Sequence, residues 1–392
     1  MHRLIISITL ICLFIYSCTD DSSKQQVEDI IATVKAKFAP DKRVALLDYT
    51  FELKGESLCL KGETNLPQAK KELLRALAGA GFTILDSLTV LPSADLEGQH
   101  SGIVNLSVCN IRSAPKHSAE LATQALLGTP LKVWKKQDGF FLVQTPDGYL
   151  GWLDAGGFVL TGDAGMDDWR ASDRVIITAG FGFVLESSTA GSSKVSDLVA
   201  GDILRKTGQV GSYTAVAFPD GRTGFVASSS LLPFREWLET RTLDAAHILA
   251  TAHEMMGRPY LWGGTSGKGM DCSGFTQTVY FLNGIMLQRD ANQQADTGEE
   301  LAADTTFQNL LPGDLLFFGR PASGDLPEKI WHVAIYEGSG KIIHASERVK
   351  VESLRRGDAA FNEERLNTYV RASRILSSAG ANGIMAVKDL PF

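Results

Sequence analysis

The spacing of apolar and polar positions first sets apart a small region near the amino terminus. Two of its segments, "VEDIIATVKAKF" and "LPQAKKELLRALAGAGF", have the spacing of helices with one apolar face. Three others, "VALLDYTFEL", "ESLCLKGE" and "TILDSLTVL", are typical of strands. The pattern predicts a small α+β module at 25–97 with the order α-β-β-α-β.

The next two regions repeat one pattern of short alternating strands. "TPDGYLGWL" at 145–153 matches "FPDGRTGFV" at 218–226, and the copies keep a constant offset of 73 residues. The Asp-Gly pair in each copy indicates a hairpin, because glycine accepts the positive φ that such turns need. Five or so short strands per copy predict one small barrel at 98–162 and a second at 163–235.

The two copies differ at polar positions. Glu120 of the first copy aligns with Ser193 of the second, and Tyr149 aligns with Arg222. The first barrel therefore carries an acid and a phenol that the second lacks. These side chains either lie on the rim without a role or form a binding feature that belongs to the first barrel alone.

The carboxyl-terminal part has a third pattern and forms a further predicted domain at 240–378. A helix at about 242–256 is ended by Gly257 and Pro259, and a second helix is followed by apolar strands. The last residues, 379–392, lack a clear period and predict a loosely packed tail. Together the regions predict a multidomain α+β protein.

Composition narrows the possible partners. A chain of 392 residues is too long for one ordinary core and predicts two to four domains. Its 44% hydrophobic and 21% charged residues are typical of a folded protein. The net charge of -7 and the lack of a basic stripe argue against a nucleic-acid partner.

The amino terminus has the features of an export signal. "MHRLIISITLICLFIYSC" is a short basic region followed by an apolar run that is too short to span a membrane comfortably. Its end, "IYSC", resembles the lipobox of bacterial lipoproteins. That resemblance implies a signal peptide at 1–17, lipid on Cys18, and a polar tether at 18–24. The expected location is the cell envelope, on a periplasm-facing or surface-exposed outer membrane. An ordinary signal peptide or an uncleaved anchor helix is the alternative.

The cysteines are informative because their number is odd after export. Without Cys12 and Cys18, the chain keeps Cys59, Cys109 and Cys272. In an oxidising compartment an odd number leaves one thiol unpaired or reactive. A Cys59–Cys109 bridge is possible, but both lie in apolar strand-like runs, which favours two reduced core cysteines.

The third cysteine lies where nucleophilic chemistry is favoured. Cys272 directly precedes the helical run "GFTQTVYFL". Backbone N–H groups and the positive end of the helix dipole stabilise a thiolate there, and the thiolate is the nucleophile. Taken alone, a buried cysteine beside a helix cap explains the same pattern.

Two histidines change that balance. "KIWHVAIYEGSGKIIHAS" predicts two strands, and a hairpin centred on Gly338 would set His332 and His344 opposite each other on one face. Cysteine, histidine and a polar group that orients the histidine form an arrangement for acyl transfer. We expect Cys272 as nucleophile, His332 as general base and then acid, and His344 as the orienting group. A zinc site with Asp271 as fourth ligand is the alternative.

Five motifs, "PYLWGG", "DCSGF", "GDLLFF", "HVAIY" and "IIHAS", resemble in this order the NlpC/p60 family of papain-like cysteine peptidases. The resemblance covers 240–377 and implies hydrolysis of amide bonds in peptidoglycan stem peptides without a cofactor or metal. It further implies that Tyr260 helps the backbone N–H of Cys272 to bind the oxyanion. Asp271 and Ser273 would line the pocket for the D-glutamate of the substrate.

The other regions also resemble known modules. "VNLSVCNIRSAPKHSAELATQALLG" is similar to bacterial SH3-like (SH3b) barrels, and 25–97 resembles BON-like modules. The two-barrel layout resembles γ-D-glutamyl-L-diamino acid endopeptidases of the dipeptidyl-peptidase VI type. In that group an acid and a tyrosine of the first barrel, with a tryptophan of the peptidase domain, bind the free amine of an N-terminal L-alanine. Glu120, Tyr149 and Trp262 match those positions.

These observations predict a lipid-anchored, monomeric cysteine endopeptidase. Its expected substrate is an L-Ala-γ-D-Glu-diaminopimelate peptide, cut after the γ-D-glutamyl carbonyl. One alternative is an inactive wall-binding lipoprotein, although the presence of Cys272, His332 and His344 favours an enzyme. The other alternative is an endopeptidase that acts on intact or cross-linked stem peptides.

Overall fold

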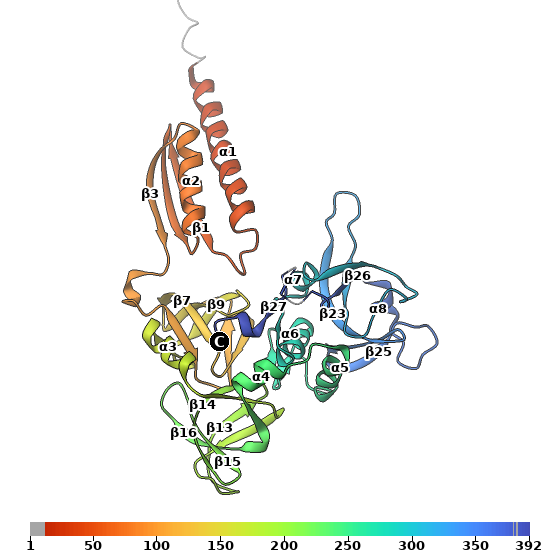
Figure 1. Cartoon of the computed structure of the whole chain (residues 1–392). Coiled ribbons are helices and arrows are strands. Elements are labelled where there is room, and N and C mark those ends of the chain that lie inside the picture. Colours follow the sequence, from red (N-terminus) through yellow and green to blue (C-terminus); the bar gives the residue numbers. More distant parts are fainter. Residues whose placement is uncertain (1–11, 379, 382) are drawn as a thin grey trace, which may run out of the picture. The chain divides into compact units, whose positions relative to one another are not determined.

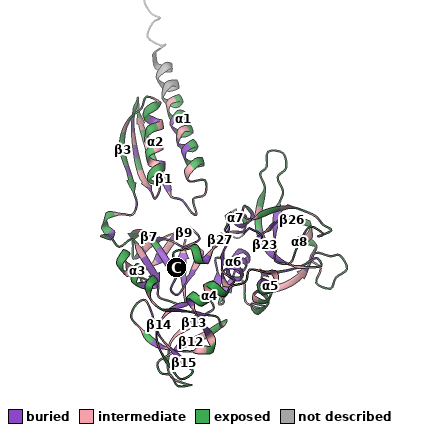
Figure 2. Cartoon of the chain, viewed as in Figure 1, coloured by how far each residue is buried: buried purple, intermediate pink, exposed green. Residues whose placement is uncertain are grey.

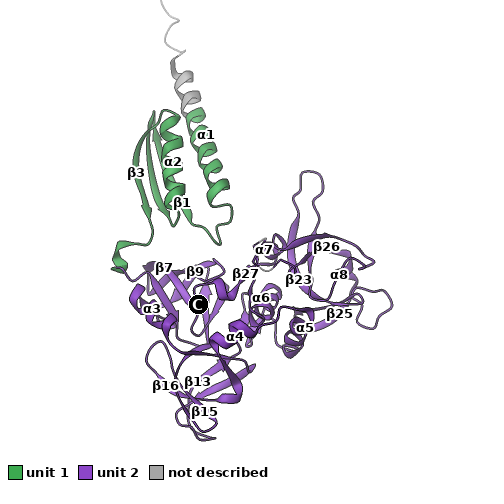
Figure 3. Cartoon of the chain, viewed as in Figure 1, with its two compact units in different colours: residues 1–97 green, residues 98–392 purple. Residues whose placement is uncertain are grey.

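The computed structural model describes the backbone of residues 12–378, 380–381 and 383–392, and side chains from residue 21 onward. Residues 1–11 of the predicted signal peptide (1–17) lie outside the described residues. The side chain of Cys18 also lies outside them. Within the described part, no helix is both long enough and apolar enough to cross a membrane. The chain forms two compact units, 1–97 and 98–392 (Figure 3).

The first unit has the predicted order of elements. Strands β1 and β2 pair antiparallel, β2 and β3 pair parallel, and the sheet order is β1-β2-β3. Helix α1 is longer than expected and includes the segment predicted to be a tether. The elements are α1 (Cys12–Phe38), β1 (Leu47–Lys54), β2 (Ser57–Thr64), α2 (Pro67–Gly79), β3 (Thr83–Val90) and η1 (Ala94–Leu96).

The core of this unit lies between its two helices and its sheet. Ile31 of α1, Leu73 of α2 and Leu60 of β2 are fully buried in one cluster. Their positions follow from the apolar stripe of each helix and the alternation of β2. Pro67 begins α2, where its missing N–H costs nothing. The module therefore has an apolar core of its own.

The second unit begins with two seven-stranded sheets. The first has the order β10-β4-β7-β8-β9-β5-β6 and the second β13-β12-β16-β15-β14-β11-β17. The first contains β4 (Ser101–Val104), β5 (Val108–Arg112), β6 (Leu121–Leu126), β7 (Pro130–Gln137), β8 (Phe140–Gln144), β9 (Leu150–Asp154) and β10 (Phe158–Thr161). The second contains β11 (Arg174–Ile177), β12 (Phe181–Leu185), β13 (Lys194–Val199), β14 (Ile203–Val210), β15 (Tyr213–Ala217), β16 (Thr223–Ala227) and β17 (Leu231–Pro233). Between them lies α3 (Asp163–Ala171).

The internal repeat is confirmed strand by strand. When the second order is read backwards, each strand starts 73 residues after its counterpart, as β11 at Arg174 does after β4 at Ser101. The short 3₁₀ turns η2 (Ala155–Gly157) and η3 (Ser228–Ser230) keep the same offset. Seven strands form in each copy rather than about five, because very short edge strands such as β17 add to the sheet.

The rest of the second unit combines helices with a six-stranded sheet of order β21-β26-β22-β23-β24-β25 (Figure 1). Its helices are α4 (Phe234–Thr240), α5 (Ala245–Glu254), α6 (Cys272–Leu282), α7 (Ala291–Ala295) and α8 (Glu363–Asn367). The sheet strands are β21 (Glu299–Ala302), β22 (Leu315–Arg320), β23 (Lys329–Gly338), β24 (Lys341–Ser346), β25 (Arg348–Ser353) and β26 (Tyr369–Arg374). Short pairs are formed by β18 (Thr265–Ser266) with β19 (Gly269–Met270), and by β20 (Ile285–Met286) with β27 (Met385–Ala386).

Helix α6 is the buried centre of this region. It packs against β23 and is buried over almost its whole length (Figure 2). Phe275 and Val279 on α6 and Val333 and Ile335 on β23 share one apolar cluster, and none of the four is exposed to solvent. The helix start is therefore fixed against the strand that carries His332.

Two expectations about less regular parts are now settled. The predicted loose tail is wrong: β27 pairs with β20, Val387 is buried, and Phe392 packs against Phe281. Its few apolar side chains fill a gap beside α6, which a periodicity search does not detect. Cys59 and Cys109 are both free thiols, as expected, but only Cys109 is a buried core residue, because Cys59 alternates with the buried Leu58 and Leu60 on β2 and is half-buried.

Candidate active site

Cys272 is the first residue of α6 and is only 7% exposed. Asp271 directly before it caps the helix, since its Oδ1 accepts a hydrogen bond from the backbone N–H of Gly274 at 2.7 Å. The predicted placement of Cys272 at a helix start is thus confirmed.

The acidity of this thiol differs from the expectation. Burial raises the pKa of Cys272 to about 11, and the negative charge of Asp271 adds to the rise, against the effect of the backbone N–H groups of Val333 and Ser273. The helix start alone would favour the thiolate, but burial and the adjacent carboxylate outweigh it. The resting site therefore holds a thiol, and a base has to take its proton.

The two histidines meet, although not in the predicted register. Strands β23 and β24 pair with Ile335 opposite Ile343, and the ladder shifts between Tyr336 and Gly338. In this register His344 lies across from Ala334 rather than from His332, so the two histidines are diagonal neighbours. The hairpin centre moves beyond Gly338, and because the pairing changes by an even number of residues, both side chains stay on one face.

The imidazoles form a direct pair. Nε2 of His332 lies 2.7 Å from Nδ1 of His344, and the rings meet edge to face with centroids 4.9 Å apart. Burial lowers the pKa of His332 well below its ordinary value, and the nearby His344, Arg365 and Lys350 lower it further. His332 is therefore neutral near pH 7, the form that can accept a proton, so its predicted role as general base stays a prediction.

A carboxylate continues this chain of contacts. Oε2 of Glu352 lies 3.1 Å from Nε2 of His344, an ion-pair distance without well-aligned hydrogen-bond geometry. Lys350 Nζ lies 2.9 Å from the other oxygen, Oε1, and Asn362 donates to Oε2 at 2.7 Å. Burial alone would raise the pKa of Glu352, but the close polar contacts with His344 and Lys350 lower it to about 2. Glu352 is therefore ionised near pH 7.

The geometry bears on the zinc alternative. The 2.7 Å between the two ring nitrogens is a hydrogen-bond distance and leaves no room for a metal ion between them. Asp271, the proposed fourth ligand, has both oxygens engaged elsewhere. Among the described residues, no group of three or more His, Cys, Asp or Glu is arranged to hold a metal ion.

Tyr260 lies on the segment that leads into the site. It forms a bridge with Met270, two residues before Cys272, and packs against the same apolar cluster. Burial raises its pKa, and the charges of Cys272 and Asp271 add to the rise. Tyr260 therefore keeps its proton and can donate it in a hydrogen bond, so its oxyanion role stays a consistent prediction.

Asp271 and Ser273, predicted to line the substrate pocket, are held by a buried arginine. Arg289 is only 1% exposed, and its guanidinium reaches both oxygens of Asp271 at 3.1 and 2.7 Å and the Ser273 hydroxyl at 3.1 Å. Burial alone would lower the pKa of Arg289, but Asp271 raises it above the ordinary value. The backbone N–H of Gly263 also donates to Asp271 at 2.9 Å. In this structure Asp271 holds its neighbours together, and direct contact with substrate stays a prediction.

The same arginine connects the site to the first barrel. Nε of Arg289 donates to the hydroxyl of Thr123 on β6 at 3.0 Å. Thr265 donates two further hydrogen bonds to Gln124 of the first barrel. Its backbone N–H donates to the side-chain oxygen at 3.0 Å, and its hydroxyl donates to the backbone carbonyl at 3.2 Å. The barrel is thus joined to the start of α6 through buried polar contacts.

The structure brings the predicted amine-binding residues close to partners in the peptidase region. Nε1 of Trp262 donates to Oε1 of Glu120 at 2.7 Å, and both side chains are exposed. The hydroxyl of Tyr149 donates to Oδ2 of Asp290 at 3.1 Å. The Glu120 carboxylate of the first barrel therefore lies beside Trp262, and the Asp290 carboxylate of the peptidase region lies beside Tyr149.

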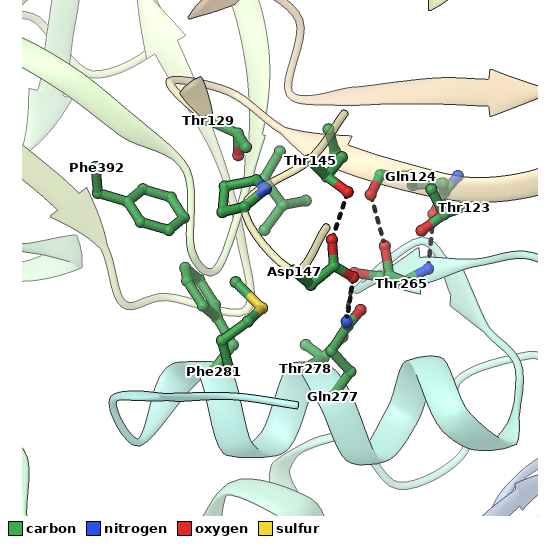
Figure 4. A pocket seen from close by; sticks show the side chains of 14 residues that line it. Thr123, Gln124, Thr129, Thr145, Asp147, Thr265, Gln277, Thr278, Phe281 and Phe392 are labelled. Carbon is green, nitrogen blue, oxygen red and sulfur yellow. Dashed lines mark hydrogen bonds between the residues drawn. The ribbon is translucent and has the colours of Figure 1, made fainter. Parts of the chain in front are cut away.

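A small cavity lies between the first barrel and α6 (Figure 4). Its volume is about 60 Å³, enough for roughly two waters. Asp147 lines this cavity. Its carboxylate accepts one hydrogen bond from the Thr145 hydroxyl and another from the Gln277 amide of α6 at 2.8 Å, and Figure 4 draws both as dashed lines. The Asp-Gly turn of the first copy therefore fastens the barrel to the nucleophile helix.

Sequence reasoning missed three residues of this site: Arg289, Asp290 and Glu352. A signal existed for Glu352, because His344 pairs with Lys350 and Glu352 lies two residues further along β25, on the same face. No pattern indicates Arg289 or Asp290, since their partners Asp271 and Tyr149 lie in separate segments.

Comparison with known proteins agrees with this geometry. The NlpC/P60 family profile matches residues 257–366, and the profile of the bacterial dipeptidyl-peptidase SH3 domain matches 111–157. The dipeptidyl-peptidase 6 of Lysinibacillus sphaericus is 31% identical over 263 residues, which cover 65% of this chain and 92% of that protein. The gamma-D-glutamyl-L-lysine dipeptidyl-peptidase of Bacillus subtilis strain 168 is 29% identical over 253 residues, which cover 62% of this chain and 79% of that protein.

A solved structure supports the fold. The crystal structure of an NlpC/P60 family protein from Bacillus cereus ATCC 10987 covers 70% of this chain and 99% of its own, with a TM-score of 0.59 and 24% identity. The matched ranges contain the thiol, both histidines and strands β6 to β9 of the first barrel. The chain therefore belongs to the NlpC/P60 family and is a cysteine peptidase that carries a bacterial SH3 domain.

Proposed function

We propose that this peptidase hydrolyses the bond between γ-D-glutamate and a diamino acid in small peptidoglycan peptides that have a free N-terminal L-alanine. The observation that carries the proposal is the contact of Trp262 with Glu120 at 2.7 Å, which joins an acid of the first barrel to the peptidase region. The name of the B. subtilis relative, a gamma-D-glutamyl-L-lysine dipeptidyl-peptidase, supports a cut after γ-D-glutamate.

The reaction follows from the resting protonation states. His332 takes the proton of Cys272 as the sulfur attacks the γ-carbonyl carbon, and the carbonyl π electrons move to the oxygen. The backbone N–H of Cys272 and the hydroxyl of Tyr260 would bind that oxyanion. The C–N bond then breaks, and His332 gives its proton to the leaving amine of the diamino acid. Water, deprotonated by His332, hydrolyses the thioester and restores the thiol.

Selectivity would come from the acids at the barrel. A substrate ammonium would pair with Glu120, whose Oε1 is held by Trp262. A stem peptide still bonded to muramic acid has an amide in place of that ammonium. It would offer no cation to Glu120 and would meet the barrel sterically, so intact stems would be rejected.

The discriminating experiment compares free L-Ala-γ-D-Glu-diaminopimelate with its N-acetylated form. We expect cleavage of the free peptide and loss of at least tenfold in kcat/KM on acetylation. Equal cleavage of both would support an endopeptidase for intact stems. Cleavage of neither by folded, reduced protein would favour a peptidoglycan-binding role and contradict the proposal.

A variant pair tests the acid itself. Glu120→Gln keeps the shape but removes the charge, so KM for the free peptide should rise about tenfold, as for loss of a charge-assisted bond. Glu186→Gln is the matched control, because the backbone N–H of Glu186 bonds Ser193, the residue that replaces Glu120 in the second barrel. A wild-type KM for Glu120→Gln would refute the amine site.

Anchoring and module identity are further parts of the proposal. Lipid on Cys18, retention at the membrane and action as a monomer rest on the "IYSC" resemblance and the expected cell-envelope substrate. Membrane fractionation of wild type and Cys18→Ala tests the anchor, and only the wild type should sediment. The repeated strand order supports SH3b identity for the second barrel too, and the α-β-β-α-β order supports a BON-like module.

A further inference from the structure

We propose that Glu352 is a positioning residue that sets the tautomers of both histidines and thereby makes the free nitrogen of His332 the base. The inference rests on the peptidase chemistry of Cys272 and not on which peptide is cut. It extends the cysteine and two histidines by a fourth group, carried on β25.

The argument starts at the carboxylate. An ionised carboxylate can only accept hydrogen bonds, so a bare nitrogen lone pair facing it at 3.1 Å would be repelled. Nε2 of His344 therefore carries the proton. A neutral imidazole has one N–H, which leaves Nδ1 of His344 as an acceptor.

The constraint then passes to the second ring. Nε2 of His332 lies 2.7 Å from that acceptor and so has to be the donor. The N–H of His332 is used in this bond, and its Nδ1 keeps a lone pair. Nδ1 is the nitrogen that His344 does not engage, and it is the atom able to take the proton of Cys272.

Glu352 is itself held in one position. Lys350 Nζ lies 2.9 Å from Oε1, and Asn362 and His344 approach Oε2, so each oxygen has a fixed environment. The charges that face the histidine pair are Lys350 on β25 and Arg365 on α8. Both are cations that oppose an imidazolium. The negative charge of Glu352 counteracts these two cations. It thereby stabilises the positive charge that His332 acquires when it takes the thiol proton.

The geometry predicts an unusual result for the isosteric variant Glu352→Gln. The Lys350 ammonium has to face an oxygen, so the amide oxygen occupies the Oε1 side and the NH₂ group faces His344. That NH₂ donates to Nε2 and reverses both tautomers, and His332 then presents an N–H instead of a lone pair to the thiol. We expect kcat to fall on the order of 10²–10⁴-fold, the range of general-base and tautomer effects.

The direct test is ¹⁵N NMR of the histidine rings without substrate. Wild type should show the Nε2–H tautomer for both His332 and His344, and Glu352→Gln should show Nδ1–H for both. Nδ1–H in wild-type His344, or unchanged tautomers in the folded variant, would overturn the proposal. The wild-type spectrum decides the matter even if the variant fails to fold.

A rescue separates positioning from general damage. Adding Lys350→Met to Glu352→Gln removes the group that orients the amide, and Asn362 then attracts the amide oxygen to the side facing His344. The kcat of the double variant should be at least tenfold higher than that of Glu352→Gln, and both histidines should regain the Nε2–H tautomer. Glu347→Gln is the control, because Glu347 also pairs with Lys350, at 3.6 Å, yet is 79% exposed. It should behave as wild type, and failure of the rescue would contradict the tautomer role.

A second readout does not depend on the proposed peptide substrate. The alkylation rate of Cys272 by iodoacetamide, followed by peptide mass, reports how readily a base removes the thiol proton. It should fall with kcat in Glu352→Gln and recover in the double variant. If wild type fails to cleave the tripeptide but the alkylation and tautomer results hold, the substrate proposal fails and the role of Glu352 stands. Unchanged alkylation in folded Glu352→Gln would sink the inference.

Discussion

The two barrel-like sheets share strand order and spacing but contact the peptidase region through different side chains: Thr123 and Asp147 of the first copy bond Arg289 and helix α6, and Asp197 of the second pairs with Lys268. The same turn position shows the difference: Asp147 is buried and bonds Gln277 of α6, whereas Asp220, 73 residues later, pairs with its neighbour Arg222. One fold is therefore used twice, and a few side chains decide how each copy contacts the peptidase region. Each prediction below compares a residue of the first copy, or the arginine that contacts it, with a residue of the second copy.

The largest effect should follow loss of the arginine that links the first copy to the nucleophile helix. Arg289→Met leaves the buried Asp271 carboxylate without its cation and should lower the free energy of unfolding by about 3–5 kcal/mol. Arg222→Met, which removes a half-buried pair with Asp220 and a 2.6 Å bond to the backbone carbonyl of Asn105, should cost less, about 1–3 kcal/mol. Urea denaturation measures both, and similar losses would contradict the asymmetry between the copies.

The two turn aspartates give the next largest difference. Asp147→Ala removes an acceptor of the buried Gln277 amide and should destabilise the protein by about 1–3 kcal/mol. Asp220→Ala should cost under about 1 kcal/mol, because its partner is near the surface. Thermal melting of the two variants checks the order, and a larger loss for Asp220→Ala would refute it.

A smaller effect is expected for the phenol of the first copy. Tyr149→Phe removes the hydrogen bond to Asp290 and should raise KM for the free tripeptide roughly three- to tenfold, with kcat nearly unchanged. Tyr213→Phe removes a phenol from β15 of the second copy and serves as control. Steady-state kinetics that show equal KM values for both variants would exclude a special role for Tyr149.

The subtlest difference concerns pH. Activity should fall on the acid side only below the usual imidazole range, because burial lowers the pKa of His332 and the base form persists at lower pH. On the alkaline side kcat/KM should fall near pH ~8, where the substrate ammonium loses its proton. Glu120→Gln should flatten this alkaline decline and leave the acid limb in place, whereas Glu186→Gln should keep both limbs. An alkaline decline that persists in Glu120→Gln would contradict pairing with the ammonium.

Features that depend on local spacing were predictable from the sequence. The 73-residue repeat, the order of elements in 25–97 and the helix that starts at Cys272 each follow from periodicity or turn chemistry within a few residues. The pairing of His332 with His344 was also predictable, because the parity of residues along a hairpin survives an even change of register.

Features that depend on close packing were not predictable. The raised pKa of Cys272 comes from burial, which a helix-start argument does not measure. The bond from Trp262 to Glu120 joins residues 142 positions apart. The ordered tail depends on a gap beside α6 that is defined only after the rest has folded. In each case the cause is a tertiary neighbour rather than a local preference.

The constant 73-residue offset also makes the chain its own guide for redesign. Each residue of the second copy has been accepted by the same strand order, so Glu120→Ser and Tyr149→Arg import side chains already compatible with that backbone. A short series of such exchanges would replace the polar side chains of the first copy, one at a time, with those of the second. If Glu120 and Tyr149 bind the substrate amine as proposed, each such exchange would widen substrate choice by one step.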